Sequence, residues 1–180
     1  INHSWGLKEW KDAINNLIQD SQKVFSDAVL AAISASAKKE VIQVSALGND
    51  FLGKNNNPGN YASLYPYFDP SVKDYWISVA NVDQDHKIYE ESNHCSISAD
   101  WCLAAPGSDI YSSIVKENIS SPEESPYSYE SWYGTSMAAP HVTGALALAM
   151  QRFPYMDNKQ IREVILTTTN NSGHLSNTAI

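Results

Sequence analysis

The chain has 180 residues and a formal net charge of −8, and 43% of its residues are apolar. This composition is typical of one globular domain with a sizeable core. The acidic balance argues against a nucleic-acid partner, which would need a basic face. No apolar run reaches the roughly 18 residues that span a bilayer. The chain opens on INHSWG without a basic-then-apolar signal segment, so we expect a fragment whose targeting information lies upstream.

Helix and strand signals alternate in the first half of the chain. Residues 21–37 carry apolar side chains at helical spacing after a short opening strand. Residues 41–50, VIQVSALGND, begin with β-branched residues and end in Gly-Asn-Asp, which predicts a buried strand running into a loop. NNNPGN at 55–60 is predicted as a loop, and 75–83 as a second strand.

The second half begins with a third strand inside residues 102–114, followed by a Pro-Gly turn. Residues 116–131 are polar and contain prolines, so we expect an exposed loop there. The whole sequence contains no internal repeat or low-complexity tract.

Two helices are predicted near the C-terminus. The first begins near Ser136, ends before Pro154 and is expected to run through the interior. The second covers 157–169, with Asp157 as its N-cap. The polar tail after Asn170 is expected to be peripheral.

This alternation predicts an α/β fold with a mostly parallel sheet and flanking helices. Sites in such folds form at the carboxyl ends of the strands. Three segments fall there: Ser4-Trp5-Gly6 after the opening strand, Gly48-Asn49 after the next strand, and Ser136 at the start of the long helix.

Cys95 and Cys102 enclose six residues. Zinc sites favour tighter pairs and need further ligands. A local disulfide fits this spacing better, and it would stabilise the fold by about 2.5 kcal/mol in the chain-entropy model. Two free thiols in a reducing compartment are the alternative. A disulfide would imply secretion, or a periplasmic or surface location.

No metal site or cofactor is evident in the sequence. Acidic residues cluster at Asp83, Asp85, Glu90 and Glu91. They lack the alternating oxygen ligands of a calcium-binding loop, so we expect no metal there.

The segment GTSMAAPHVTGALAL, residues 134–148, places Ser136 at the mouth of an apolar helix. First-turn N–H groups have no partner within a helix, and the macrodipole adds partial positive charge beside them. The N–H of Ser136 is therefore suited to stabilising an oxyanion, with an asparagine from a neighbouring loop as a second donor. Gly134 allows a tight entry, and Pro140 is expected in the first turn, where a missing N–H costs little.

This segment resembles the nucleophile segment of the subtilisin-like serine peptidases, the subtilases. INHSWG resembles the family's substrate-binding strand, VSALGND its oxyanion-asparagine block, and AAPG at 104–107 the strand before the nucleophile, all in the family's order. The resemblance runs from Ile1 to about Thr168 and implies a three-layer subtilisin-like fold. SNHCSISADWCLAAPG further resembles a cysteine-bracketed version in bacterial autotransporter subtilases.

The resemblance implies a role for each matching residue. Ser136 would be the nucleophile and Asn49 the oxyanion-hole side chain. The remaining implied residues form the two walls that bind the substrate: Ser4, Trp5 and Gly6 on one side, and Ala46, Leu47 and Gly48 on the other. Calcium is a cofactor by resemblance only.

The family orders its triad Asp, His, Ser, and both partners precede the block that begins at Ile1. We therefore expect residues 1–180 to be the C-terminal portion of a catalytic domain, inactive alone, with Asp and His supplied upstream. His141 lies five residues after Ser136, roughly 140° round an ideal helix, and is interpreted as a packed histidine. His3 lies in the substrate strand, and the others, His86, His94 and His174, lie in loops.

Serine endopeptidase is thus the predicted function, with a peptide or protein substrate. The resemblance also implies a secreted or bacterial cell-surface location and a membrane-anchored β-barrel in the full-length protein. A non-catalytic, peptide-binding or structural subtilase-like module is the alternative. Without the other matching segments, Ser136 would be interpreted as an N-cap on a core helix. An α/β hydrolase is disfavoured, because its Gly-x-Ser-x-Gly elbow would need glycine at Ala138.

Overall fold

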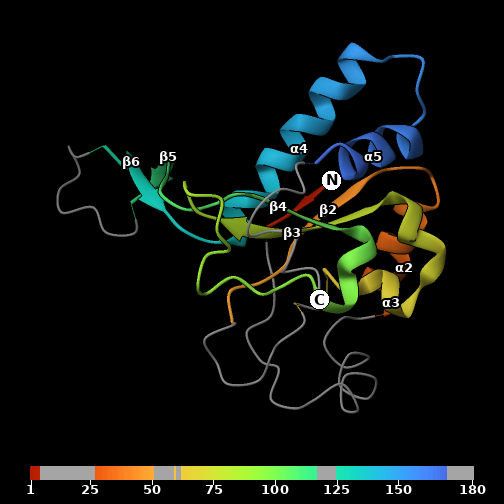
Figure 1. Ribbon diagram of the computed structural model, residues 1–180, viewed down its shortest axis with the longest axis horizontal. Helices are drawn as coiled ribbons and strands as arrows, with labels where there is room; N and C mark the ends of the chain where they lie inside the picture. The colour runs from red at the N-terminus through yellow and green to blue at the C-terminus, as the bar shows by residue number, and fades with distance from the viewer. Residues whose placement is uncertain (5–26, 51–58, 60–61, 117–124, 170–180) are drawn as a thin grey trace.

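A four-stranded parallel sheet forms the centre of the computed structural model (Figure 1). The strands lie in the order β1 (Asn2–His3), β2 (Gln43–Ala46), β3 (Trp76–Val82) and β4 (Cys102–Pro106). All residues of β3 are buried, as expected for an inner strand of a parallel sheet covered on both faces. The structure describes residues 1–4, 27–50, 59, 62–116 and 125–169. The predicted α/β fold with a parallel sheet is confirmed.

Helices cover both faces of this sheet, which gives three layers (Figure 1). On one face lie α4 (Thr135–Arg152) and α5 (Asn158–Thr167). Strand alternation turns Val44, Ile77 and Val79 toward this layer, where they form one apolar cluster with buried residues of α4.

The opposite face carries α2 (Asp27–Ala37), the short α3 (Tyr65–Phe68) and two 3₁₀ helices, η1 (Pro70–Tyr75) and η2 (Ser96–Trp101). Their core is a second cluster around Trp76, whose ring is fully buried 5.6 Å from that of Tyr65. The predicted helix at 21–37 is confirmed for its described part; residues 21–26 lie outside the described residues.

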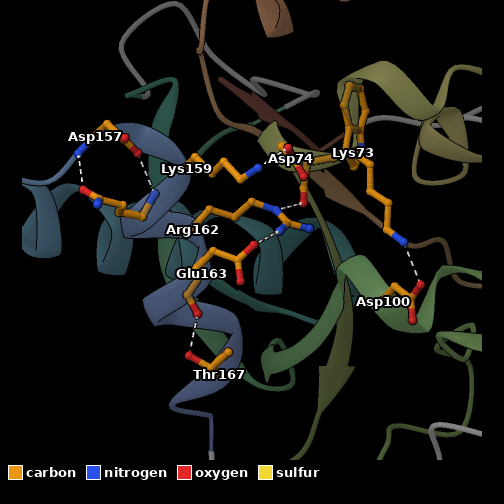
Figure 2. Close-up of polar contacts among 10 residues, drawn as sticks. Lys73, Asp74, Asp100, Asp157, Lys159, Arg162, Glu163 and Thr167 are labelled. Atoms are coloured by element: carbon orange, nitrogen blue, oxygen red, sulfur yellow. Dashed lines mark hydrogen bonds and ion pairs between the residues drawn. The ribbon is translucent and has the colours of Figure 1, made fainter.

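Helix α5 is fixed to the end of the sheet remote from Ser136, at the start of β3. Its predicted N-cap is confirmed, because the Asp157 side chain accepts a bond from the Gln160 N–H and the Gln160 side chain accepts one from the Asp157 N–H. Two anchors follow along the helix. Arg162 Nε donates to the Trp76 carbonyl at 2.8 Å, and Lys159 pairs with Asp74 (Figure 2).

Helix α4 differs from its predicted position in one respect. It begins at Thr135, and only one of its faces is buried, through Ala138, Ala139, Val142 and Leu146. The prediction that it runs through the interior is therefore wrong for the described residues, where it lies on the sheet with its other face in solvent. Among the helices that the structure describes, none is long and apolar enough to cross a membrane.

A hairpin replaces part of the loop predicted at 116–131. Strands β5 (Ile110–Val115) and β6 (Tyr127–Trp132) pair antiparallel and project from the sheet (Figure 1). The loop prediction is wrong for 127–131, because Tyr127–Glu130 alternates aromatic and polar residues as a strand does. The proline-containing stretch 117–124 lies outside the described residues, as do most of the predicted loop at 55–60 and the tail from Asn170.

Cys95 and Cys102 form the predicted disulfide, with their Cα atoms 5.7 Å apart. The bond joins the start of η2 to the first residue of β4. It therefore fixes η2 to the start of β4, the strand beside β3.

Replacing both cysteines by serine should lower the free energy of unfolding by about 2–3 kcal/mol, because the unfolded chain gains the freedom of an opened loop. Urea denaturation of the oxidised protein and the double variant measures this difference. Wild-type protein treated with reductant is the control and should match the variant. Identical midpoints for the oxidised protein and the variant would refute a stabilising role.

Candidate active site

Two glycines allow the chain to enter α4 tightly. Gly134, the residue before the helix, has φ 144°, a conformation that other residues avoid. Its N–H donates to the Gly107 carbonyl at 2.8 Å. A Cβ atom at Gly107 would lie 2.6 Å from the Gly134 carbonyl oxygen, so the backbones approach more closely than a side chain permits. This contact joins the end of the AAPG segment to the helix mouth.

Asn49 lies beside the same helix mouth, held by Thr135. The Thr135 N–H donates to Asn49 Oδ1 at 2.9 Å, and the Thr135 hydroxyl donates to the same oxygen at 3.1 Å. Thr135 Oγ1 also accepts the Gly48 N–H at 3.0 Å. Because the carboxamide oxygen receives both donors, Nδ2 turns the other way, and no hydrogen bond from it to a described residue is present.

A buried asparagine fixes this loop from its other side. Asn93 donates through Nδ2 to the Leu47 carbonyl at 3.2 Å, and its Oδ1 accepts the Asp50 N–H at 3.1 Å. Its N–H donates to the Gly48 carbonyl at 2.9 Å. The sequence interpretation missed both Asn93 and Thr135 as positioning residues, because neither carries a local signal beyond an ordinary turn or helix-start residue.

Ser136 follows directly in the first turn of α4 and is half-buried. Its hydroxyl does not cap the helix, since Gly134 is the N-cap. Met137 and Ala138 direct their N–H groups to the Gly134 carbonyl, whereas the Ser136 N–H has no hydrogen bond to any described residue. The site thus offers a free N–H at a helix N-terminus, which favours negative charge.

Ser136 and Ser4 exchange two hydrogen bonds. Ser136 Oγ donates to the Ser4 carbonyl at 3.1 Å, and Ser4 Oγ donates to the Ser136 carbonyl at 2.8 Å. The second bond depends on Pro140, which lies inside α4 beyond the first turn and has no N–H to occupy that carbonyl. The strand before Ser4 is thereby fixed against the predicted nucleophile.

His141 does not act on Ser136 in this arrangement. Its Nδ1 donates to the Met137 carbonyl at 2.9 Å, one turn back along α4. The ring is exposed, so the interpretation of a packed histidine is wrong for the described residues. His141 is exposed because it lies on the face of α4 that points away from the sheet.

His3 is turned to the opposite side of the sheet. It is buried, its Nε2 hydrogen-bonds Gln43 Oε1 at 2.9 Å, and its ring stacks on Trp76 with centroids 6.1 Å apart. Of the three histidines predicted in loops, His174 lies outside the described residues. Among the described histidines, none hydrogen-bonds Ser136, so no histidine in the described part of the chain is placed as a base for the predicted nucleophile.

The order of these segments, their parallel sheet and a serine at a helix mouth beside an asparagine amide match the arrangement that the sequence resemblance implies. The family model of the subtilase family, peptidase S8, matches residues 1–179. The chain belongs to the subtilase family. Its fold is accordingly a partial subtilisin-like one.

Several relatives of this subtilase are bacterial surface or secreted proteins by name. It is 35% identical to serotype-specific antigen 1 of Mannheimia haemolytica, over 96% of this chain and 18% of the relative. It is 35% identical to an extracellular serine protease of Serratia marcescens, over 81% of this chain and 15% of the relative. It is 33% identical to the autotransporter lipoprotein NalP of Neisseria meningitidis, over 75% of this chain and 12% of the relative.

A solved protease of Pseudoalteromonas arctica matches the subtilase with a TM-score of 0.65 and 25% identity, over 94% of this chain and 43% of the other. The chain thus spans less than a fifth of the curated relatives above and less than half of this solved protease.

The substrate-binding residues implied by the subtilase resemblance fall into two groups. Ser4 lies against Ser136, whereas Trp5 and Gly6 are outside the described residues. Ala46 and Leu47 are buried, and Gly48 is half-buried. Their role in substrate binding stays a prediction.

The acidic turn at Asp83 is held by hydrogen bonds and an ion pair among its own residues. Asp83 Oδ1 accepts the N–H groups of Asp85 and Lys87, and Asp85 pairs with the Lys87 side chain. The acidic turn is therefore satisfied internally. Within the described ranges, no group of three His, Cys, Asp or Glu side chains is placed to hold an ion.

Burial of His3 generates a pH prediction. Desolvation lowers its pKa below the ordinary 6.5, although the bond to Gln43 opposes this. Below about pH 6.5 the unfolded chain therefore binds a proton that the folded chain resists, and stability falls as the pH falls. Thermal denaturation at pH 7.5 and 5.0 should show a smaller drop in the thermal midpoint for His3→Phe than for wild type, because the variant has no histidine at this position to protonate. Some drop should remain in both proteins, because burial also lowers the pKa of His94. Equal losses would exclude His3 as a contributor.

Proposed function

We propose that residues 1–180 are the C-terminal part of the catalytic domain of a serine endopeptidase that forms an acyl-enzyme on Ser136. The observation that carries this proposal is the helix mouth of α4. There Ser136 has an N–H with no partner among the described residues. The neighbouring Thr135 donates two hydrogen bonds to Asn49 Oδ1, which leaves Asn49 Nδ2 available as a second donor. Family membership supports a peptidase.

The proposal gives roles in acyl transfer to Ser136 and Asn49. Ser136 Oγ attacks the peptide carbonyl carbon, and the carbonyl oxygen becomes an oxyanion. The Ser136 N–H and Asn49 Nδ2 donate to this oxyanion, where one such donor is worth roughly 3 kcal/mol of transition-state stabilisation. Collapse of the tetrahedral species expels the amine, which takes up the proton that the base removed from Ser136, and water then hydrolyses the ester to free Ser136.

The hydroxyl proton requires a base from outside the described residues. In this structure it is directed to the Ser4 carbonyl, which cannot remove it. The subtilase resemblance supports an upstream histidine, oriented by an upstream aspartate, as the base. A serine without its base keeps only what the oxyanion hole and binding supply, so the isolated 180 residues should be essentially inactive.

The substrate is a peptide or protein, and the location is secreted or on the bacterial cell surface. Relatives named extracellular serine protease and autotransporter lipoprotein support this location, as does the Cys95–Cys102 disulfide. The autotransporter relative further supports a membrane-anchored β-barrel in the full-length protein. Calcium as a cofactor rests on the family resemblance alone.

Replacing Asn49 should separate its donor from its structural role. In the full-length protein, Asn49→Asp keeps the oxygen that accepts the Thr135 N–H but loses the Nδ2 donor. We expect kcat to fall roughly 100- to 1000-fold with little change in KM, and the thermal midpoint to stay near wild type. Asn49→Ala should lower kcat similarly and also lower the thermal midpoint, because it removes the oxygen that accepts the Thr135 N–H and hydroxyl. An unchanged kcat in both variants would remove Asn49 from the mechanism.

A serine-directed fluorophosphonate probe tests the nucleophile itself. We expect strong labelling at Ser136 in the full-length protein, little labelling of the isolated 180 residues, and none at that position in Ser136→Ala. Peptide mapping locates the label.

Two results would contradict this assignment in different ways. Equal, rapid labelling of the isolated residues would mean that they contain a base. No labelling of the folded full-length protein would favour a non-catalytic, peptide-binding or structural module.

A further inference from the structure

Arg162 on α5 has hydrogen-bonding capacity that the described residues do not use. Its side chain is only 4% exposed, although arginine is rarely buried unless it is paired. Nε donates to the Trp76 carbonyl at 2.8 Å, and Nη1 donates to Glu163 at 3.3 Å. Nη2 is closed off from solvent and has no hydrogen-bond partner among the described residues. A buried donor without an acceptor is destabilising, so this atom indicates a site for an acceptor.

The Arg162 side chain lines a cavity of about 390 Å³ between α5, η1 and η2. Figure 2 shows this side chain extending from α5 toward the side on which Lys73 and Asp100 lie, and both of these residues line the same cavity. Cys102, at the start of β4, also lines it. Because Cys102 is bonded to Cys95, this strand end brings no charge to Arg162.

The charges around the cavity decide which acceptor fits. Two cations and three carboxylates line it: Lys73, Arg162, Asp74, Asp100 and Glu163. Asp100 is paired with Lys73 at 2.6 Å, and Asp74 is paired with Lys159. A divalent anion would be repelled by the three carboxylates, whereas a carboxylate adds a single negative charge and matches the planar guanidinium. Ala99 and Leu166 also line the cavity and suit a short apolar body.

We infer that this cavity binds a monocarboxylate whose oxygens accept hydrogen bonds from Arg162 Nη2 and the Lys73 ammonium group. Two sources share this chemistry, a free small carboxylate and the C-terminal carboxylate of a peptide. The cavity lies beside α5, at the end of the sheet remote from Ser136 (Figure 1). The inference therefore goes beyond the proposed peptidase activity and does not depend on it.

Entry of the ligand requires only exposed side chains to move. The Glu163 side chain is 51% exposed and contacts Arg162 through a single bond to Nη1. Ion pairs in such positions are weak, so an incoming carboxylate can displace Glu163 from the guanidinium. Glu163 is therefore a competitor of the ligand, and its neutralisation should strengthen binding.

Equilibrium dialysis of labelled butyrate against the full-length protein tests the site. We expect saturable binding of one butyrate per chain. Unlabelled butyrate should displace it, whereas butyramide, which has no charge, should not. Inorganic phosphate at neutral pH should compete more weakly than butyrate, because of the three carboxylates.

Substitutions locate the bound butyrate. Lys73→Met should weaken its binding at least about tenfold through loss of a charged donor, and Glu163→Gln should strengthen it about two- to fivefold. Arg162→Lys should abolish binding, but it also loses the bond to the Trp76 carbonyl, so Lys73→Met keeps the test decisive should Arg162→Lys fail to fold. Arg152→Met, which removes an exposed arginine at the end of α4, is the matched control and should bind butyrate as wild type does.

Three results would overturn the inference. Absence of saturable binding to the folded wild-type protein would indicate that only water reaches Nη2. Unchanged binding in Lys73→Met would place the butyrate at another site, and stronger competition by phosphate than by butyrate would contradict a monocarboxylate.

A peptide competitor separates the two sources, and either answer supports a carboxylate site. Displacement of butyrate by N-acetyl-dialanine, but not by its C-terminal amide, would identify a chain terminus as the ligand. Failure of both to displace it would identify a free small carboxylate.

Discussion

The oxygen of the Asn49 side chain joins two segments that lie 86 residues apart in the chain, and the arrangement of the site depends on it. By accepting both the N–H and the hydroxyl of Thr135, it caps the first turn of α4 and positions its own amide. Asn93 holds the same loop from the core side. The predicted oxyanion donors are therefore fixed before any substrate arrives, which is the condition for electrostatic preorganisation.

Features with local signals were predictable from the sequence. The Asp157 cap, the buried strand at β3 and the disulfide follow from neighbouring residues, and the structure contains all three. The site motif was also readable, because its segments occur in the family's order. Strand β6 was missed because prolines and serines nearby outweighed its alternating aromatic residues. Thr135 and Asn93 were missed because their bonds exist only once distant loops meet.

The position of α4 shows a different limit of sequence reasoning. Its alanines and leucines predict a buried helix, and the inward face agrees with that prediction. The outward face does not, because burial depends on which neighbours are present as well as on the helix itself. The same reasoning explains why His141 is exposed although its surroundings in the sequence are apolar.

The paired bonds between Ser4 and Ser136 also constrain the order of folding. They close a loop of 132 residues, and such non-local contacts form late because their closure entropy is paid before they contribute. At about 5–20 residues per second, synthesis of the intervening chain takes roughly 7 to 26 s. During this interval β1 has been made but its partner at the helix mouth has not. Ser136 therefore reaches its place beside Ser4 only after nearly all of this region has been synthesised.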